Sequence, residues 1–410
     1  MAHQKYSKYK NSGIEWLGEI PEHWKKGKLG KIANFRRGSF PQPYGLKKWY
    51  NDENGFPFIQ VYDVGENMKL KPTTKRKISD EAKKKSVFIK KGTLILTIQG
   101  SIGRLAITDY DACIDRTLLI FQSYNLPIKV GYFKQVISLL FSFEEKKAIG
   151  STIKTINKEK LSSFIIPIPN FSEQTAIANY LDQKLEKINA FITKKKQLIT
   201  LLEEQKAAII NDAVTKGLDK TVAMKDSGVE WLGEIPEHWE VMRLKNIAKI
   251  SNGKDCNKLK GKYPVYGSGG IFGWTENYIY DKPSVLLGRK GTIDKPIYVT
   301  EPFWTVDTAF YTKIYEDKII SLFFYFLCCN INFGYYSSKT ALPSMTQTSL
   351  YEAKFSIPPK TEQQKIVTYI ETATKKIDRT ISTIQKELDL VSEYKTALIA
   401  EAVTGKIRIS

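Results

Sequence analysis

Two long stretches of the chain place apolar residues at steps of three and four. They run from Ser172 to Val214 and from Thr361 to Val403, and neither contains Gly or Pro. This spacing predicts two helices of about 40 residues, each roughly 60 Å long at ~1.5 Å per residue. Ser172 and Thr361 follow proline-rich segments and are the expected N-caps, because their hydroxyls can accept a hydrogen bond from a free backbone N–H.

The apolar positions of each predicted helix form one narrow stripe, as in a coiled coil. Each stripe needs a partner, and we expect the two helices to pair with each other, antiparallel. The predicted seam consists of Leu185, Ile188, Ile192, Ile199, Leu202 and Ile209 in the first helix, and of Ile377, Ile381, Ile384, Leu388, Val391 and Leu398 in the second. Lys206 and Lys395 occupy equivalent seam positions, where they either extend their ammonium groups to water or fix the helix register.

Before each helix lies a segment rich in β-branched and aromatic residues and punctuated by Gly, Pro, Asn and Asp. Short strands are predicted at 56–64, 93–98, 113–123, 284–288 and 296–300. Each segment ends in a predicted helix, at 130–149 and at 319–333. The pattern therefore indicates one mixed α+β domain of ~150 residues in each half of the chain.

The two halves repeat the same order of segments. Residues 12–24 read SGIEWLGEIPEHW and residues 227–239 read SGVEWLGEIPEHW, so twelve of thirteen positions match. The beginning of the first long helix, 172–188, returns as 361–377 with shared Glu, Gln, Ile and Tyr positions. A chain doubled in this way can build a pseudo-twofold object from one polypeptide.

The middle of each half differs more than its ends. Gly38 and Gly253 correspond at an offset of 215 residues, but Gly100 and Gly291 correspond at an offset of 191, which gives the first half 24 additional residues between these points. Constant ends with a variable middle are expected of one scaffold that carries two different recognition surfaces.

These patterns together predict the fold class and the domain limits. The fold is expected to be α+β, with two mixed α/β domains separated by two long antiparallel coiled-coil helices and related by a pseudo-twofold internal repeat. The predicted limits are 1–170 for the first domain, 171–217 for the first helix, 218–359 for the second domain and 360–410 for the second helix.

Charge and composition narrow the range of partners. The chain carries 63 Lys and Arg against 43 Asp and Glu, a net charge of +20. This excess favours a polyanion, either nucleic acid or an anionic membrane face. The longest apolar run, 319–329, is too short to span a bilayer, and the N-terminus lacks a signal-peptide pattern. We therefore expect no membrane association and a cytoplasmic location.

Motifs for catalysis or metal binding are missing from the sequence. No Gly-Lys is followed by Ser or Thr as a phosphate-binding loop requires, and no Asn-Pro-Pro-aromatic motif of adenine methylation occurs. The Gly-rich segment 267–273 follows a turn-like YPVY and is interpreted as a β-turn. The four cysteines form no CxxC pair. We expect a binding protein with no catalytic residues and no metal site.

Several motifs resemble the specificity subunit of type I restriction–modification systems. They are the duplicated EWLGEIPEHW phrase, the helix entries IPIPNFSEQTAI (166–177) and IPPKTEQQKI (357–366), and the helix exits AVTKG (213–217) and AVTGK (402–406). YPVYGSGGIFGW (263–274), GRKGTIDKP (288–296) and VDTAFY (306–311) resemble the target-recognition domains of that family. The resemblance covers nearly the whole chain.

The resemblance implies that each domain reads one half of a bipartite, asymmetric site in double-stranded DNA. It also implies that the helices set the spacing and dock two methyltransferase (modification) subunits, which endonuclease/translocase (restriction) subunits join. This chain is then expected to bind no cofactor, with S-adenosylmethionine, ATP and Mg on the partner subunits. The first domain reads TIQGSIGR (97–104) in place of the GRKGTI pattern, which concerns its base preference and not its role.

Candidate DNA contacts are polar and basic residues that lie beside glycines, at turns that follow predicted strands in both halves. In the first domain they are Arg36, Arg37, Ser39, Gln99, Ser101 and Arg104; in the second they are Asn252, Lys254, Tyr266, Ser268, Arg289, Lys290 and Thr292. Glycine lets the backbone approach phosphate closely, and these side-chain types read base edges in the major groove. A single residue of such a set contacts phosphate more often than a base.

Two other classes of function remain open from the residues alone. The chain could be an enzyme whose catalytic motif is not recognised, or a stand-alone DNA-binding regulator. Turnover by the pure chain would support the first, and purification without a methyltransferase-like partner would support the second.

Overall fold

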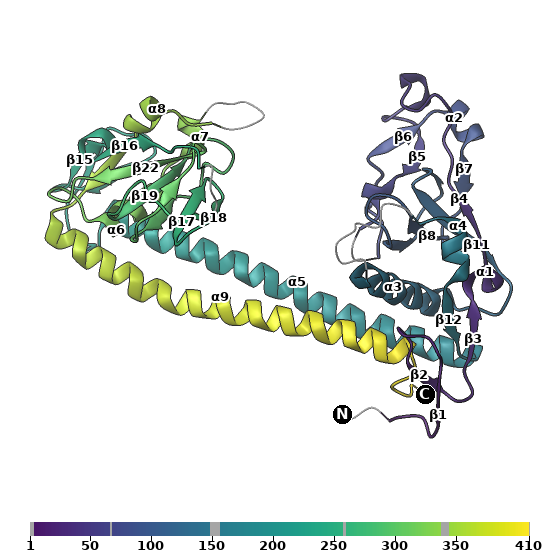
Figure 1. Ribbon diagram of the computed structural model, residues 1–410. Coiled ribbons are helices and arrows are strands. Elements are labelled where there is room, and N and C mark those ends of the chain that lie inside the picture. Colours follow the sequence, from purple (N-terminus) through teal and green to yellow (C-terminus); the bar gives the residue numbers. More distant parts are fainter. Residues whose placement is uncertain (1–3, 66–67, 148–155, 257–259, 338–343, 410) are drawn as a thin grey trace. The chain divides into compact units, whose positions relative to one another are not determined.

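The computed structural model describes residues 4–65, 68–147, 156–256, 260–337 and 344–409. The chain divides into two compact units, one of residues 1–194 with 387–410 and one of residues 195–386. Each unit contains one mixed domain and a part of both long helices (Figure 1). The predicted domain limits at 170, 217 and 359 stay predictions, because the two units divide the chain within the helices instead.

The first unit contains two four-stranded sheets. One has the order β4 (Ala33–Arg37), β11 (Leu118–Tyr124), β8 (Leu94–Thr97), β9 (Leu105–Ile107), and all its pairs are antiparallel. The other has the order β6 (Arg76–Ile78), β5 (Phe56–Ile59), β10 (Ala112–Ile114), β7 (Val87–Ile89), with β5 and β10 parallel. Two short pairs join β1 (Tyr9–Asn11) to β2 (Glu19–Pro21) and β3 (Lys25–Lys28) to β12 (Ile165–Ile168).

The second unit repeats the main sheet strand for strand and has a smaller second sheet with one strand fewer. Its main sheet has the order β16 (Ala248–Asn252), β22 (Ala309–Ile314), β19 (Ser284–Gly288), β20 (Ile297–Val299). The smaller sheet has the order β18 (Gly270–Thr275), β17 (Tyr263–Gly267), β21 (Trp304–Thr305), again with one parallel pair. The short pairs are β13 (Met224–Asp226) with β14 (Glu234–Pro236) and β15 (Glu240–Arg243) with β23 (Lys354–Ile357). Strands occur within all five predicted segments, and those predicted at 93–98, 284–288 and 296–300 are confirmed as β8, β19 and β20. The segment 56–64 is a strand only as far as Ile59, because Val61–Asp63 form a 3-10 turn. The segment 113–123 is wrong as one strand, because it contains parts of β10 and β11, which belong to different sheets.

Short helices complete each domain. The first domain has α1 (Leu29–Ile32), α2 (Asp80–Lys85), α3 (Val130–Lys147) and α4 (Lys158–Ser163), with 3-10 turns η1 (Lys47–Trp49) and η2 (Val61–Asp63). The second has η3 (Leu244–Asn246), α6 (Ser321–Cys329), α7 (Phe333–Tyr336) and α8 (Gln347–Tyr351). The helix predicted at 319–333 is thus shorter than expected, and positions 148–149 of the one predicted at 130–149 lie outside the described residues.

The two long helices are α5 (Phe171–Lys216) and α9 (Lys360–Val403), of 46 and 44 residues. The predicted N-caps are wrong, because both helices begin one residue earlier. In α5, the side chain of Asn170 accepts the backbone N–H of Glu173 at 2.9 Å, which is the capping contact that Ser172 was expected to make. Ser172 lies in the first turn and donates its hydroxyl to Asn170 at 2.6 Å.

The two long helices run antiparallel to each other within each unit (Figure 1). In the first unit Lys395 Nζ donates to Asn189 Oδ1 at 2.9 Å, and in the second Lys206 Nζ lies 2.6 Å from Asp378 Oδ1. Asn189 and Asp378 are repeat equivalents, as are the two lysines, so the same cross-helix contact occurs twice. The ammonium groups reach the partner helix rather than extending to water alone.

The predicted seam residues lie on the covered sides of these helices. Ile377, Ile384, Leu388 and Leu398 are buried, and Leu185, Ile188, Ile192, Ile199, Leu202, Ile209, Ile381 and Val391 are half-buried. In the first unit Leu398 belongs to the same core that Leu185 and Ile188 pack against. Partial burial is expected of a two-helix seam, since two helices leave part of their contact open to water. The predicted α+β fold with paired antiparallel helices is confirmed.

The duplicated phrase docks the domains onto the helix ends. Trp24 is fully buried, and its Nε1 donates to Glu173 in the first turn of α5 at 3.2 Å, while His23 Nε2 lies 2.9 Å from the same carboxylate. In the second unit Trp239 and His238 make the same contacts to Glu362 of α9, at 3.2 and 2.8 Å. The repeated Trp, His and Glu therefore have a structural role.

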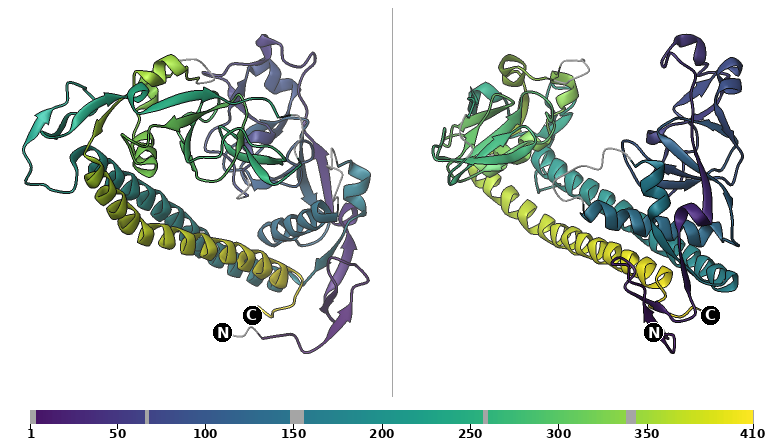
Figure 2. Two further views of the ribbon diagram at one scale, coloured as in Figure 1. Left: turned by 60° about the vertical axis from the view of Figure 1, so that its left-hand side comes forward. Right: turned by 45° about the vertical axis from the view of Figure 1, so that its right-hand side comes forward.

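The glycines of the helix exits complete this junction. Gly405, with φ +75°, ends α9 against the duplicated phrase, where a Cβ would lie 2.4 Å from Cδ of Pro21 and 3.0 Å from the Trp24 ring. Gly217, with φ +70°, ends α5 and would meet the Trp239 ring at 3.1 Å. A side chain at either position would have a strained backbone, and at Gly405 it would also collide with Pro21. In both views of Figure 2 the end of α9 lies beside β1 and β2.

The glutamine of each helix entry holds the chain that leads into the helix. Gln174 Nε2 donates to the carbonyls of Pro127 and Pro169, and its Oε1 accepts the backbone N–H of Lys129 at 3.0 Å. Gln363 repeats the arrangement in the second unit. Buried amides need such partners, which explains why the Glu-Gln pair recurs in the sequence.

Candidate nucleic-acid interface

In each mixed domain, three segments that are distant in the sequence meet at one end of the main sheet. Because β11 pairs antiparallel with both β4 and β8, the end of β4, the start of β11 and the end of β8 lie together. β16, β22 and β19 repeat this arrangement. We call these surfaces the first edge (residues 37–39, 99 and 116) and the second edge (residues 252–254, 290 and 307).

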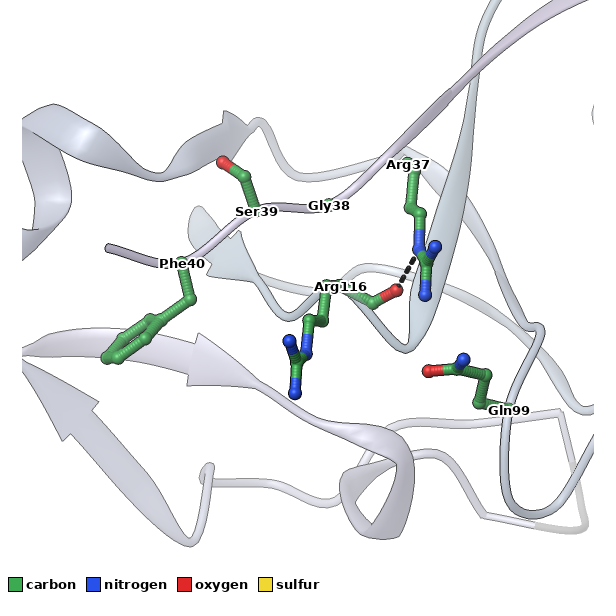
Figure 3. Close-up of a pocket in the computed structure, with 6 residues that line it drawn as sticks. All are labelled: Arg37, Gly38, Ser39, Phe40, Gln99 and Arg116. Atoms are coloured by element: carbon green, nitrogen blue, oxygen red, sulfur yellow. Dashed lines mark hydrogen bonds between the residues drawn. The ribbon is translucent and has the colours of Figure 1, made fainter. Parts of the chain in front are cut away.

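The first edge surrounds a hollow of about 480 Å³. It is lined by Arg37, Gly38, Ser39, Phe40, Gln99 and Arg116. Figure 3 shows the side chains of Arg37, Arg116 and Gln99 converging on one side, whereas the Ser39 hydroxyl points away from them. Arg37 Nε donates to the backbone carbonyl of Arg116 and so ties β4 to the start of β11. Three residues predicted as DNA contacts, Arg37, Ser39 and Gln99, are thus brought together.

A glycine makes the close approach at each edge possible. A Cβ on Gly38 would lie 2.2 Å from the carbonyl oxygen of Asp115, and a Cβ on Gly253 would lie 2.1 Å from that of Val306. Both distances are far below van der Waals contact, and in both cases the obstacle is backbone. Glycine is therefore required by the packing of two chain segments, and not only by a turn.

Arg116 is held over an aromatic ring. Its guanidinium lies 5.1 Å from the centre of the Tyr44 ring, within cation–π range. The Tyr44 hydroxyl donates to Asp115 at 3.2 Å and accepts from Gln60 Nε2 at 2.9 Å. Burial, and next the Asp115 carboxylate, raise the pKa of Tyr44 well above its usual value, which keeps the phenol protonated as a donor. Two hydrogen bonds therefore orient the ring that the arginine lies over.

The other predicted contacts of the first domain lie outside this hollow. Arg36 is exposed on β4 and Ser101 is exposed after β8, where its carbonyl accepts from the Thr97 hydroxyl. Arg104 is half-buried, with Nη1 3.5 Å from the carbonyl oxygen of Val64. Its side chain therefore contacts its own domain.

The second edge has a different chemistry. Lys290 Nζ lies 3.6 Å from Asp307 Oδ2, and both side chains are about half exposed. Asn252 Oδ1 accepts from Gln347 Nε2 at 3.0 Å. Lys254 is exposed, and its carbonyl accepts from Trp304 Nε1 at 2.7 Å. This edge thus presents a carboxylate, two ammonium groups and an amide pair, where the first edge presents two guanidinium groups and one amide.

Two predicted contacts of the second domain are turned into the fold. Tyr266 is only 7% exposed and packs in a core with Leu286 and Phe303, so its ring is unavailable to DNA in this conformation. Arg289 is half-buried, with Nη1 3.4 Å from the carbonyl of Asp307 and its guanidinium 5.8 Å from the Phe310 ring. Both side chains are of types suited to DNA binding, but they contact other residues of their own domain instead.

The remaining two predicted contacts, Ser268 and Thr292, are half-buried near each other. The backbone N–H of Ser268 donates to Thr308 Oγ1 at 3.3 Å. A Cβ on Gly291 would lie 3.4 Å from Ser268 Oγ, which places the loop before Thr292 against the turn after β17. These residues border the second edge without forming its charged part.

Arg116 and Asp307 were missed by the sequence prediction. They are separated by 191 residues, the same offset that relates Gly100 to Gly291. Arg116 lies two residues before β11, within the segment predicted as one strand at 113–123, and Asp307 lies two residues before β22, which was not among the predicted strands. Comparing the two halves position by position at this offset would have identified them as equivalent residues of opposite charge.

Within the part of the chain that the structure describes, no group of three or more His, Cys, Asp or Glu is placed to hold a metal ion. None of the described helices is both long and apolar enough to cross a membrane.

The sequence of this chain matches a known family of DNA specificity proteins. The profile of the Type I restriction modification DNA specificity domain matches residues 21–201 and again residues 236–390. The two matches cover most of the chain and correspond to its two repeated halves. The chain therefore belongs to the family of type I restriction–modification specificity subunits.

Curated relatives span the same length. The chain is 24% identical to the type I restriction enzyme MjaVIII specificity subunit of Methanocaldococcus jannaschii, over 95% of this chain and 94% of the relative. It is 22% identical to the EcoprrI specificity subunit of Escherichia coli, over 84% of both chains.

A solved structure from work on complex assembly and conformational transition of the type I R-M system has the same fold. It covers 94% of this chain and 98% of its own, with a TM-score of 0.64 and 12% identity.

Proposed function

We propose that this chain is the sequence-specific DNA-binding subunit of a type I restriction–modification complex, in which each mixed domain reads one half of a bipartite, asymmetric site. Family membership supplies the general role of DNA specificity. That each domain reads a different half-site follows from the residues of the two edges.

One observation carries this division. The first and second edges occupy the same place on the same sheet, yet their polar groups differ at every aligned position that we compared: Arg37 with Asn252, Ser39 with Lys254, Gln99 with Lys290 and Arg116 with Asp307. A duplicated scaffold with unlike side chains at equivalent positions is expected to select two unlike base sequences. Equal edges would favour a palindrome instead.

The long helices supply the spacing in this proposal. At ~1.5 Å per residue, helices of 46 and 44 residues extend over roughly 65 to 70 Å. Two half-sites one DNA turn apart are separated by ~34–36 Å, which such helices can bridge once the width of the domains is included. The net charge of +20 supplies attraction to phosphate in both half-sites.

The proposal assigns the chemistry to other subunits. Two methyltransferase subunits would dock on the helices and bring S-adenosylmethionine, and restriction subunits would bring the ATP- and Mg-dependent steps. Large apolar side chains remain exposed along the helices, among them Leu201 and Leu390, which are repeat equivalents at 60% and 65% exposure. Equivalent exposed apolar positions fit two copies of one docking partner.

Reconstitution tests this function. The pure chain, incubated with DNA, Mg²⁺ and S-adenosylmethionine, should give no turnover, and addition of the methyltransferase subunit encoded with it should give adenine methylation that requires the chain. Turnover by the pure chain would make it an enzyme. Sequence-specific binding without any association with the methyltransferase subunit would make it a regulator.

A further inference from the structure

Arg116 and Asp307 occupy one position of the duplicated fold with opposite charge. Arg116 lies two residues before β11, and Asp307 lies two residues before β22. Arg116 lines the same hollow as Gln99, which follows β8. Asp307 lies beside Lys290, which follows β19. Among the aligned residues of the two edges, this is the pair in which a cation stands opposite an anion. A change from cation to anion also reverses which base atoms the position can bind.

The two arginines of the first edge, Arg37 and Arg116, can donate hydrogen bonds but cannot accept them. Arg116 converges with Arg37 and Gln99 on the hollow (Figure 3). Its guanidinium also lies over the Tyr44 ring, 5.1 Å from the ring centre. A guanidinium held in one plane matches the two acceptors, O6 and N7, that guanine presents in the major groove. Preorganisation of this kind lowers the entropy cost of the contact.

The second edge offers an acceptor at the same place. The Asp307 carboxylate is about half exposed, and Lys290 at 3.6 Å offsets its charge without covering it. The backbone of Asp307 is fixed by Arg289, whose Nη1 lies 3.4 Å from its carbonyl oxygen. A carboxylate repels phosphate, so its presence on a DNA-binding edge needs a base donor, and the N4 amine of cytosine is such a donor.

We propose that Arg116 and Asp307 are specificity-determining residues, Arg116 for a guanine in one half-site and Asp307 for a cytosine in the other. This inference rests on the proposed function, since it assumes that both edges face DNA. Beyond that function, it names one residue in each domain that distinguishes between bases, and the base that each residue selects.

Selection from a random DNA library tests the inference, with the full chain assembled with its methyltransferase subunits. Wild type should return a bipartite sequence. Arg116→Ala should relax the preference for guanine at one position by roughly 5- to 150-fold and leave the other half-site unchanged. The other positions of the same half-site should keep their preference, which reports that the first domain is folded.

Asp307→Asn should produce a new preference rather than a loss. The asparagine side chain keeps the shape of aspartate but presents an acceptor and a donor, which pair with N7 and N6 of adenine. One position of the other half-site should therefore shift from cytosine toward adenine. A gain of this kind cannot arise from unfolding.

Arg243→Ala is the matched control. Arg243 is an exposed arginine on β15 that pairs with Glu352 at 3.3 Å, and its removal should leave both half-sites as in wild type. Equal weakening by Arg116→Ala on all sequences, with a reduced salt dependence, would reassign Arg116 to phosphate and overturn the inference. So would an unchanged base preference in Asp307→Asn. If wild type itself returns no bipartite sequence, the proposed function fails instead.

Discussion

Single residues decide how closely the segments of each edge approach. The sequence predicted Arg37, Ser39, Gln99, Asn252, Lys254 and Lys290 as DNA contacts because each of them neighbours a glycine, and the structure places all six on the two edges. The sequence could not separate these from Tyr266 and Arg289, which follow the same local pattern but pack inward. The direction of a side chain depends on contacts with distant strands, and local spacing does not contain that information.

Gly38 is the residue whose replacement should disturb the first edge most directly. In Gly38→Ala the new methyl group meets backbone at 2.2 Å, and β4 must shift away from the start of β11. We expect a loss of about 1–3 kcal/mol in the free energy of unfolding, as in other overpacked sites, together with weaker DNA binding. Denaturant unfolding and a DNA titration measure the two effects.

Gly269→Ala provides the comparison for this substitution. No atom lies within 4 Å of a Cβ at Gly269, and its φ is not positive. The free energy of unfolding should change by less than about 0.5 kcal/mol, as for an ordinary surface position. Equal destabilisation by the two substitutions would show that the approach at Gly38 is not the cause.

Glu173 makes the junction of the first unit dependent on pH. Burial alone would raise its pKa, but the hydrogen bonds from His23 and Trp24 outweigh burial and hold the pKa below its usual value. A carboxyl whose pKa is lower in the folded chain stabilises the fold above its unfolded pKa, near 4.5, and loses this contribution as the pH falls through the folded value.

Glu173→Gln should therefore destabilise the chain at neutral pH by roughly 1 kcal/mol and have a smaller effect under acid conditions. The measurement is the difference in unfolding midpoint between variant and wild type from pH 7 to pH 3. A difference that stays constant over this range would contradict the role given to the Glu173 charge.

At the scale of elements, the long helices were the most predictable part of the fold. Their apolar residues recur at helical spacing over more than forty residues without Gly or Pro, and such a pattern is typical of a long α-helix alone. Their first residues were misplaced, because the cap of α5 comes from Asn170 and a single side-chain contact decides it. Short strands were located but could not be paired, since pairing between distant strands leaves no local signature.

The lysines of the seam are expected to contribute little to stability. Lys206 and its partner Asp378 both remain accessible to water, with side chains 34% and 51% exposed, so their attraction is screened. Lys206→Met should change the free energy of unfolding by less than about 1 kcal/mol. A loss well above that value would indicate that the pair fixes the register of the helices.

Lys395→Met separates the effect of charge from that of position. Its partner, Asn189, is neutral, and burial lowers the pKa of Lys395, which means that the position disfavours the charged form. We expect this variant to be as stable as wild type or slightly more stable, by thermal unfolding at pH 7. A clear destabilisation would show that the hydrogen bond to Asn189 outweighs the cost of burying the ammonium group.

For the whole molecule, the duplication itself was the most informative feature of the sequence. It predicted two copies of one domain and two equivalent helices, and the topology of the two units agrees strand for strand in their main sheets. It did not predict where the chain divides, since the two compact units meet within the long helices and no change of composition marks that point.

The claim on which the functional account depends is that one chain selects two unlike half-sites. Mapping methylated adenines across a genome, in cells with the methyltransferase subunit and with or without this chain, tests it most directly. The account predicts methylation that requires the chain and falls in two dissimilar sequence blocks at a fixed separation. Methylation unaffected by the chain, or confined to one uninterrupted or palindromic sequence, would contradict it.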